Sequence, residues 1–303
     1  MGGGSFNDND YKSYSHSRGR TYDDNTGRTS GQSFTQTKLD QSLNPLYFQI
    51  RECCNSDEHP NTIPVILGLD LTGSMGAACK ECADALGVIM KSLYKKFKDI
   101  EFCIMGIGDL AYDRGSVQMS QFESDIRIAE SLDKIWREGG GGGNGYESYS
   151  VAWYMGLKRT KLDCWKQGRK GIIITMGDEP MNPYLPYRKL NDYTNSNESR
   201  DVNTNSLYSE AKEKFDIFHI AIDDRDSCYS MYDSDIKNSF GQLLGKRLKV
   251  STIQNLAKTI EECITESVGA GAMITTTAAQ AEPLNEEEES SEVKFNENGE
   301  ITW

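Results

Sequence analysis

The sequence predicts an α/β domain, built as a doubly wound, mainly parallel sheet with helices on both faces. Apolar runs of strand length recur at 65–71, 101–108, 171–177 and 216–222. Such near-continuous runs are typical of strands that are covered on both faces. Segments with helical spacing lie between these runs, and alternation of strand and helix indicates a parallel sheet with crossover helices.

The individual elements follow from the same patterns. The text NPLYFQIREC, from Asn44, indicates an extra edge strand ahead of the first core strand, VILGLDL. Weaker strands are expected at 117–122 and near LKVST. The stretch from 181 to about 203 is polar and is expected to be a loop. Helices are expected where apolar residues recur every three or four positions, at 78–97, 128–136, 151–157, 205–215 and 253–266.

Composition divides the 303 residues into three parts. Residues 1–42 are rich in Gly, Ser, Tyr, Asn and Arg without hydrophobic periodicity, which predicts a flexible N-terminal arm. Residues 43–270 hold the α/β domain. Residues 271–303 form an acidic tail that is expected to be disordered, because eight acidic residues and one lysine give it −7 of the net charge of −13.

Charge and cysteine usage limit the function classes. The net charge of −13 disfavours a protein that wraps nucleic acid. No apolar run approaches the ~18 to 20 residues of a membrane span, and the start MGGGSFNDND lacks the apolar core of a signal peptide. The eight cysteines lie mostly inside predicted helices and strands, as buried thiols in a reducing compartment do. We therefore expect a soluble, cytoplasmic protein without disulfides, nucleic-acid partner or membrane contact.

Oxygen-bearing side chains gather where the predicted strands end. The stretch GLDLTGSMG places Asp70, Thr72 and Ser74 at alternate positions after the first core strand. Asp178 follows another strand, and Glu147 follows the glycine-rich run GGGGGNGY. Ligands of parallel sheets bind beyond the carboxyl ends of the strands. An all-oxygen set suits hard divalent cations, so we predict a Mg²⁺ site, with Mn²⁺ and Ca²⁺ as alternatives.

These residues resemble the von Willebrand factor A (vWA) domain, whose fold is Rossmann-like. That family carries a metal-ion-dependent adhesion site (MIDAS) with the pattern Asp-x-Ser-x-Ser, then a distant Thr and a distant Asp. Asp70 and Ser74 match the first motif directly, Thr72 matches its middle position conservatively, and Asp178 in TMGDEP matches the last Asp. The resemblance spans roughly residues 60–268.

One position departs from the adhesion pattern. Where the family has Thr, this chain reads GGGGGNGYES, which is similar to the intracellular, prokaryotic-type branch of the family. The resemblance assigns this position to Glu147, with Ser148 and Asn144 as weaker choices. If Glu147 ligates the ion, three carboxylates surround it and repel a fourth from a partner, so the site is structural or binds a neutral ligand. If it does not, the ion stays open to a partner.

Simpler interpretations stand beside each of these. Thr72 or Ser74 is also suited to capping the helix that follows DLTGSM, and Glu147 to complementing the dipole of the helix that follows the glycine run. Asp109 and Asp113 are either outer-shell acceptors or solvated loop residues. Cys79 and Cys82 form a CxxC pair that, with Cys53 and Cys54, has the composition of a zinc site, although packing is the better interpretation. His219 is expected in the core.

Interpretations of the chain as an enzyme fit the sequence less well. The glycine run is not a phosphate-binding loop, because no Lys follows it. A haloacid-dehalogenase-like phosphatase also begins with a strand that ends in Asp, but it needs an acid at position 72, where this chain has Thr. We expect no catalytic residues and no enzyme activity.

The sequence therefore favours a metal-ion-dependent protein-binding module. The segment 181–203 is the best candidate for partner contact, with Tyr184, Tyr187, Tyr193, Arg188 and Lys189. The family resemblance implies an AAA-type ATPase or a subunit of a larger assembly as the partner. The alternative is a scaffold component of a bacterial or viral assembly, in which the tails make the contacts and the metal only stabilises the fold.

Overall fold

The computed structural model describes residues 4–139, 143–225, 227–269, 294–295 and 301–302. They divide into two units, Met1–Met273 and Ile274–Trp303. The helices of the first unit are α1 (Asp8–Ser17), α2 (Gly76–Lys96), α3 (Arg127–Asp133), α4 (Val151–Arg159), α5 (Tyr187–Thr194), α6 (Thr204–Lys214), α7 (Tyr229–Leu244) and α8 (Leu256–Val268). Short 3₁₀ turns are η1 (Pro45–Tyr47), η2 (Asp163–Gln167), η3 (Gly245–Arg247) and η4 (Ile253–Asn255).

A six-stranded sheet forms the centre of this unit, in the order β12-β11-β8-β4-β5-β6. All neighbours are parallel except β5 and β6. Its strands are β4 (Ile63–Asp70), β5 (Ile100–Ile107), β6 (Val117–Met119), β8 (Gly171–Gly177), β11 (Phe215–Ile222) and β12 (Leu248–Ser251). The α/β class and the mainly parallel sheet are thus confirmed.

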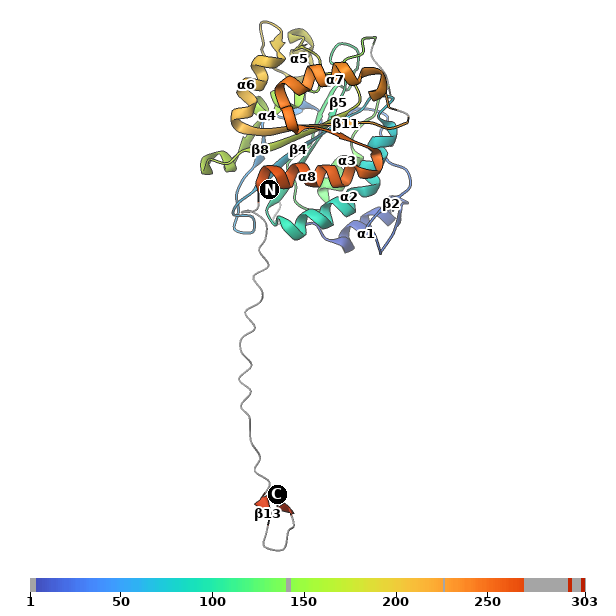
Figure 1. Ribbon diagram of the computed structural model, residues 1–303, viewed down its shortest axis with the longest axis vertical. Coiled ribbons are helices and arrows are strands. Elements are labelled where there is room, and N and C mark those ends of the chain that lie inside the picture. Colours follow the sequence, from blue (N-terminus) through green and yellow to red (C-terminus); the bar gives the residue numbers. More distant parts are fainter. Residues whose placement is uncertain (1–3, 140–142, 226, 270–293, 296–300, 303) are drawn as a thin grey trace. The chain divides into compact units, whose positions relative to one another are not determined.

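Both faces of the sheet are covered, because each strand buries side chains in two directions. In β4, Val65, Leu67 and Leu69 belong to the core on one face, and Ile66 belongs to the core on the other. Helices α1, α2, α3 and α8 pack on the first face and α4, α6 and α7 on the second (Figure 1). This two-sided burial explains why the strands read as continuous apolar runs.

The N-terminal segment corrects the expectation of a flexible arm for residues 1–42. From residue 4 onward it packs on the domain through α1 and the hairpin of β1 (Thr21–Tyr22) and β2 (Thr29–Ser30). Phe6 and Tyr11 are buried, and Arg20 forms a buried ion pair with Asp133 at the end of α3. A few aromatic and charged anchors hold the segment, so it lacks the periodic apolar pattern that sequence analysis detects.

A glycine in α2 makes this close packing possible. A Cβ at Gly87 would lie 2.4 Å from the carbonyl oxygen of Gly27 and 2.6 Å from the ring of Tyr11. Real Cβ atoms do not approach other atoms so closely, so only glycine lets the arm lie against the helix. Deleting residues 1–42 would therefore uncover buried surface of the domain.

Other elements differ from expectation more locally. The expected edge strand near Asn44 is η1 followed by β3 (Arg51–Cys53), which pairs with β7 (Thr160–Leu162) outside the central sheet. The expected loop at 181–203 contains α5 and a small hairpin of β9 (Tyr184–Leu185) and β10 (Val202–Asn203). Helix α7 was not predicted, although Ile236, Phe240 and Leu244 are buried at a spacing of four.

In the second unit the structure describes four residues, in β13 (Lys294–Phe295) and β14 (Ile301–Thr302), which pair antiparallel. The rest of the expected acidic, disordered tail lies outside the described residues. Across the described part of the whole chain, no helix combines the length and apolarity that a membrane crossing requires.

Candidate functional site

The candidate site lies where β4 and β8 end. After β5 and β6 on one side of β4, the chain returns to the other side of β4 to form β8. Adjacent parallel strands whose connections leave in opposite directions open a crevice at their carboxyl ends. Leu69 is in register with Met176, so Asp70 and Asp178 emerge at the same edge of the sheet.

Asp70 is fully buried and accepts three hydrogen bonds. Its Oδ1 accepts from the backbone N–H of Thr72 at 2.9 Å and from the Thr72 hydroxyl at 2.6 Å. Its Oδ2 accepts from the hydroxyl of Tyr149 at 2.6 Å. The carboxylate is therefore held in one orientation at the end of β4.

Ser74 connects the first loop to the second carboxylate. Its hydroxyl donates to Oδ1 of Asp178 at 3.0 Å, and the other oxygen of Asp178 accepts from the backbone N–H of Cys228 at 2.6 Å. Four of the five predicted ligands, Asp70, Thr72, Ser74 and Asp178, thus form two hydroxyl–carboxylate pairs on adjoining loops.

The helix-capping interpretation of DLTGSM does not hold. Helix α2 begins after Met75, and no side chain forms a cap hydrogen bond there. The hydroxyls of Thr72 and Ser74 donate to carboxylates instead. A hydroxyl oxygen that donates its proton keeps lone pairs, so both oxygens can still serve as metal ligands.

Tyr149 was missed by sequence analysis, which had no signal to separate it from a core aromatic residue. It lies fully buried between the sheet and α7, with its ring 5.6 Å from that of Phe240. A Cβ at Gly177 would lie 1.9 Å from the Tyr149 hydroxyl. Glycine at the end of β8 therefore makes room for the hydroxyl that orients Asp70.

Replacing Gly177 by alanine should displace Tyr149 from Asp70. We expect a loss of about 1–3 kcal/mol in the free energy of unfolding, as is usual when a packed core must admit an extra methyl group. Urea unfolding would measure it. Gly241→Ala is the matched control, because no atom lies within 4 Å of a Cβ built there. Equal stability of the two variants would contradict this role of Gly177.

Six carboxylates gather at this edge of the sheet, which we call the acidic edge: Asp70, Asp109, Asp113, Glu147, Asp178 and Glu179. Within residues 4–139, 143–225 and 227–269, none of them takes part in an ion pair. Arg137 approaches the first loop, but it donates to the carbonyl oxygen of Thr72 at 2.9 Å. In the described part of the chain, no Lys, Arg or His side chain therefore neutralises these carboxylates by an ion pair.

The carboxylates destabilise one another in their charged forms. Burial raises the pKa of Asp70, and the charge of Asp178 raises it further. Burial also raises the pKa of Asp178. Burial and then the charge of Asp70 raise the pKa of Glu147, and the same two causes raise that of Glu179 to about 7. A bound divalent cation reverses this effect, because it favours the charged form of each neighbour.

Glu147 lies apart from the helix start at which it was expected. Helix α4 begins four residues later, at Val151, so Glu147 does not complement the first turn of its dipole. Its backbone pairs instead with the loop after β8, with its N–H donating to Pro180 and its carbonyl accepting from Asn182. Its Oε2 is buried without a hydrogen-bond partner. After burial, the charge of Asp70 is the largest cause that raises the pKa of Glu147, ahead of the charges of Glu179, Asp113 and Asp109.

The remaining candidates near Glu147 belong to the neighbouring loop. Asp109 is fully buried, with Oδ1 accepting from the N–H of Ala111 at 2.9 Å and Oδ2 without a partner. Asp113 accepts from the N–H of Asp109 at 2.8 Å. Ser148 donates to Asp109 at 3.3 Å, and the side-chain oxygen of Asn144 is buried without a partner. Asp109 is therefore not a solvated loop residue.

Nowhere in the described ranges do three or more His, Cys, Asp or Glu side chains come together as a metal-binding group. The CxxC cysteines Cys79 and Cys82 are buried free thiols in α2. His219 lies in the core, as predicted, with its ring stacked on Phe240 at 3.8 Å and Nδ1 2.9 Å from the Thr175 hydroxyl.

The residues present suit a hard cation. Asp70 and Asp178 supply two buried carboxylates, and Thr72 and Ser74 supply two hydroxyls already fixed beside them. All four are oxygen donors, which Mg²⁺ prefers. Glu147 adds a third carboxylate nearby, but it forms no three-acid group with Asp70 and Asp178 in the described structure. Sequence analysis also missed Cys228, Arg137 and Glu179, which no motif marks.

Comparison with known proteins adds little to this description. No family model and no curated protein sequence matches the chain. Among solved structures, proximal thread matrix protein 1 from the mussel byssus is similar over 70% of this chain and 48% of its own, with 11% identity and a TM-score of 0.44. The pilus adhesin SpaC from Lactobacillus rhamnosus GG, in its open conformation, is similar over 70% and 31%, with 12% identity and a TM-score of 0.45.

A second crystal structure of SpaC gives 14% identity and a TM-score of 0.43, over 70% of this chain and 32% of its own. The chain thus spans less than half the length of each of these proteins. Likenesses at this level carry no argument about function.

Proposed function

We propose that this chain is a vWA-type, metal-ion-dependent protein-binding module with a MIDAS-like site. The observation that carries the proposal is the arrangement of Asp70, Thr72, Ser74 and Asp178 at the carboxyl ends of the adjacent strands β4 and β8. Buried carboxylates that lack a paired cation are costly, and a divalent ion offsets that cost.

The four residues would have different roles in binding the ion. Asp70 and Asp178 supply the negative charge, and the hydroxyls of Thr72 and Ser74 supply neutral ligands. Tyr149 and the N–H of Cys228 orient the two carboxylates by hydrogen bonds from behind. When bound, Mg²⁺ offers a Lewis-acidic position to a partner's oxygen. We assign Glu147 to the wall of the site, which keeps the ion open to a partner's carboxylate.

The surroundings of the acidic edge suit protein contact. Tyr112, Tyr146 and Met231 are exposed large side chains on loops and a helix that border it. Aromatic side chains and methionine are enriched in protein interfaces. Tyr184 is exposed in β9, and Arg188 and Lys189 are exposed on α5, so the segment 181–203 remains the proposed partner contact. An AAA-type ATPase or an assembly subunit remains the expected partner.

The scaffold alternative is weaker because of the N-terminal arm. That alternative assigns the contacts to the tails, but from residue 4 the arm is held by the buried Arg20–Asp133 pair and by Tyr11. It is therefore not free to reach a partner without unpacking from α2 and α3.

Metal binding predicts opposite effects of one substitution in two buffers. In EDTA, Asp70→Asn removes a buried, uncompensated charge, so the variant should melt at or above the temperature of the wild type. With Mg²⁺ at about 100 times Kd, the wild type should gain about 2.7 kcal/mol and the variant almost nothing. Thermal melting measures both, and Mn²⁺ and Ca²⁺ serve as further arms.

The exposed acid Asp57 provides the control, because Asp57→Asn should respond to Mg²⁺ like the wild type. An equal Mg²⁺ shift in Asp70→Asn, or no shift in the wild type, would reject the metal site. For function, the same three proteins are used to capture partners from the source cells in Mg²⁺ and in EDTA. A partner held by wild type and Asp57→Asn in Mg²⁺, and lost in EDTA and in Asp70→Asn, is the expected result; no such partner would contradict the proposal.

A further inference from the structure

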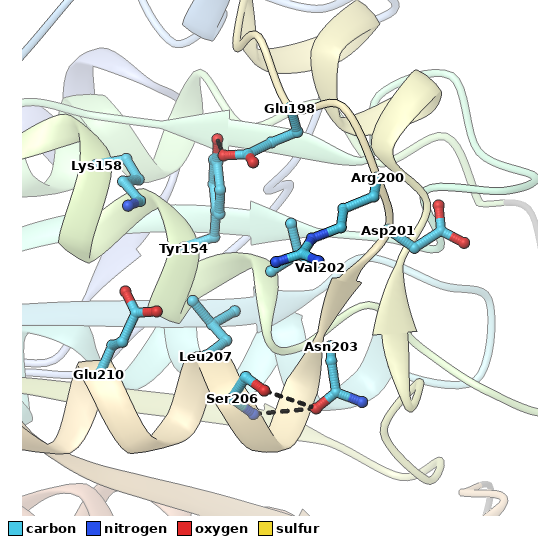
Figure 2. Close-up of a pocket in the computed structure, with 10 residues that line it drawn as sticks. All are labelled: Tyr154, Lys158, Glu198, Arg200, Asp201, Val202, Asn203, Ser206, Leu207 and Glu210. Carbon is cyan, nitrogen blue, oxygen red and sulfur yellow. Dashed lines mark hydrogen bonds between the residues drawn. The ribbon is translucent and has the colours of Figure 1, made fainter.

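A pocket of about 420 Å³ lies between α4, α6 and the segment that leads into β10 (Figure 2). It shares no lining residue with the acidic edge. Its volume is within the range of small-molecule sites, about 300–1,000 Å³. The pocket is thus separate from the metal site. Five of its ten lining residues lie in the segment 181–203, but none of them is among the side chains assigned above to partner contact.

The apolar part of the lining comes from one residue on each of three elements. Tyr154 of α4 and Leu207 of α6 are both buried, and Val202 of β10 is partly buried. The Tyr154 hydroxyl donates to the Glu198 carboxylate at 2.8 Å, and Asn191 bonds the backbone of Glu198 on both sides. These contacts fix the wall of the pocket, so its shape is formed without a ligand.

Some charged side chains of the pocket form hydrogen bonds within the chain, and others do not. Glu198 accepts from Tyr154, and Asp201 accepts from the N–H of Tyr187 at the start of α5. Lys158, Arg200 and Glu210 form no hydrogen bond or ion pair through their side chains with any part of the chain that the structure describes. Figure 2 shows Arg200 reaching inward over Val202 from one wall, and Glu210 beneath Lys158 on the opposite wall.

This arrangement of Arg200 and Glu210 on opposite walls favours a ligand that carries one negative and one positive charge. The Arg200 guanidinium is a planar fork that binds a carboxylate through two hydrogen bonds. The Glu210 carboxylate on the other wall can accept from an ammonium group. A ligand with only a negative charge would face Glu198 and Glu210 unpaired, and one with only a positive charge would face Arg200 and Lys158. The apolar lining between the walls suits an aliphatic side chain.

We propose that this pocket binds a zwitterion with an apolar side chain, of the size of a free amino acid or a dipeptide. Its carboxylate pairs with Arg200, its ammonium pairs with Glu210, and its side chain lies on Leu207 and Val202.

Isothermal titration calorimetry on the full chain tests this with four probes: L-leucine, L-leucyl-L-leucine, N-acetyl-L-leucine and L-leucinamide. The titrations are made in EDTA, so that their outcome does not depend on the metal site. We expect leucine or the dipeptide to bind, and the tighter of the two identifies the source. Removing either charge from leucine should weaken binding about tenfold or more.

Two variants assign the charges to residues. In Arg200→Gln, leucine should lose its advantage over leucinamide, and in Glu210→Gln it should lose its advantage over N-acetyl-leucine. Arg225→Gln and Glu213→Gln replace exposed residues outside the pocket and should bind like the wild type. The proposal is overturned if neither leucine nor the dipeptide binds at up to about 10 mM. Equal binding of all four probes, or unchanged discrimination in both pocket variants, would also overturn it.

Discussion

Asp133→Ala is expected to destabilise the protein by about 3–5 kcal/mol, the usual effect of removing one partner of a buried ion pair. The Asp133 side chain is 6% exposed and contacts Arg20, whose side chain is buried to the same extent. It also accepts from the Tyr14 hydroxyl at 2.7 Å. The variant leaves a buried guanidinium without a counter-ion and a hydroxyl without its acceptor. Urea unfolding at neutral pH would measure the loss.

A double variant tests whether the loss of stability comes from the unpaired charge of Arg20 rather than from lost packing. Arg20→Met with Asp133→Leu replaces both charges by apolar groups of similar size, so it should recover most of the stability that Asp133→Ala loses. Limited proteolysis within residues 4–42 gives a second readout, since cleavage should quicken in Asp133→Ala and slow again in the double variant. A loss below about 1 kcal/mol in Asp133→Ala would show that the arm does not depend on this pair.

The second large effect is a loss of stability in acid that originates at His219. Burial lowers the pKa of His219 to about 3, against 6.5 for an ordinary histidine. Between these values the unfolded chain binds a proton that the folded chain does not, so stability is complete above pH 6.5 and falls as the pH drops toward 3. Each pH unit corresponds to about 1.4 kcal/mol, which gives about 2.7 kcal/mol at pH 4.5.

Glutamine at position 219 stays uncharged, and comparison of His219→Gln with the wild type isolates this contribution. The variant loses the stacking on Phe240 at every pH, so it should be less stable at pH 7.5. Its deficit should shrink by about 2.7 kcal/mol at pH 4.5, because its unfolded state gains no proton at this position. His16 is exposed on α1, and His16→Gln should follow the wild type throughout. An unchanged deficit of His219→Gln at both pH values would refute this prediction.

The fold was predictable where a strand is buried on both faces, as in β4 and β8, because such a strand needs a continuous apolar run in the sequence. The N-terminal arm was not predictable, because what holds it is specific contacts such as Tyr11 against Gly87 and Arg20 against Asp133. Those partners are far apart in the sequence and leave no periodic pattern. Helix α7 left a signal, with Ile236, Phe240 and Leu244 every fourth residue, among polar residues that obscured it.

For the candidate site, the sequence predicted the side chains but not the contacts that orient them. Strand ends and spacing were enough to bring Asp70, Ser74 and Asp178 to one edge. Tyr149 reaches Asp70 only because β8 ends in Gly177, a relation between two distant positions. The position of Glu147 depends on its backbone pairing with the loop after β8, which no local pattern reveals.

The anchoring of the arm to α3 also has a consequence for synthesis on the ribosome. Arg20 and Asp133 are 113 residues apart, and translation adds roughly 5–20 residues per second. The segment around Arg20 therefore waits roughly 6–23 s for the helix that receives it. Tyr11 likewise has no surface to pack on until Gly87 of α2 has been made. A chaperone would therefore be needed while this segment is nascent rather than in the finished protein.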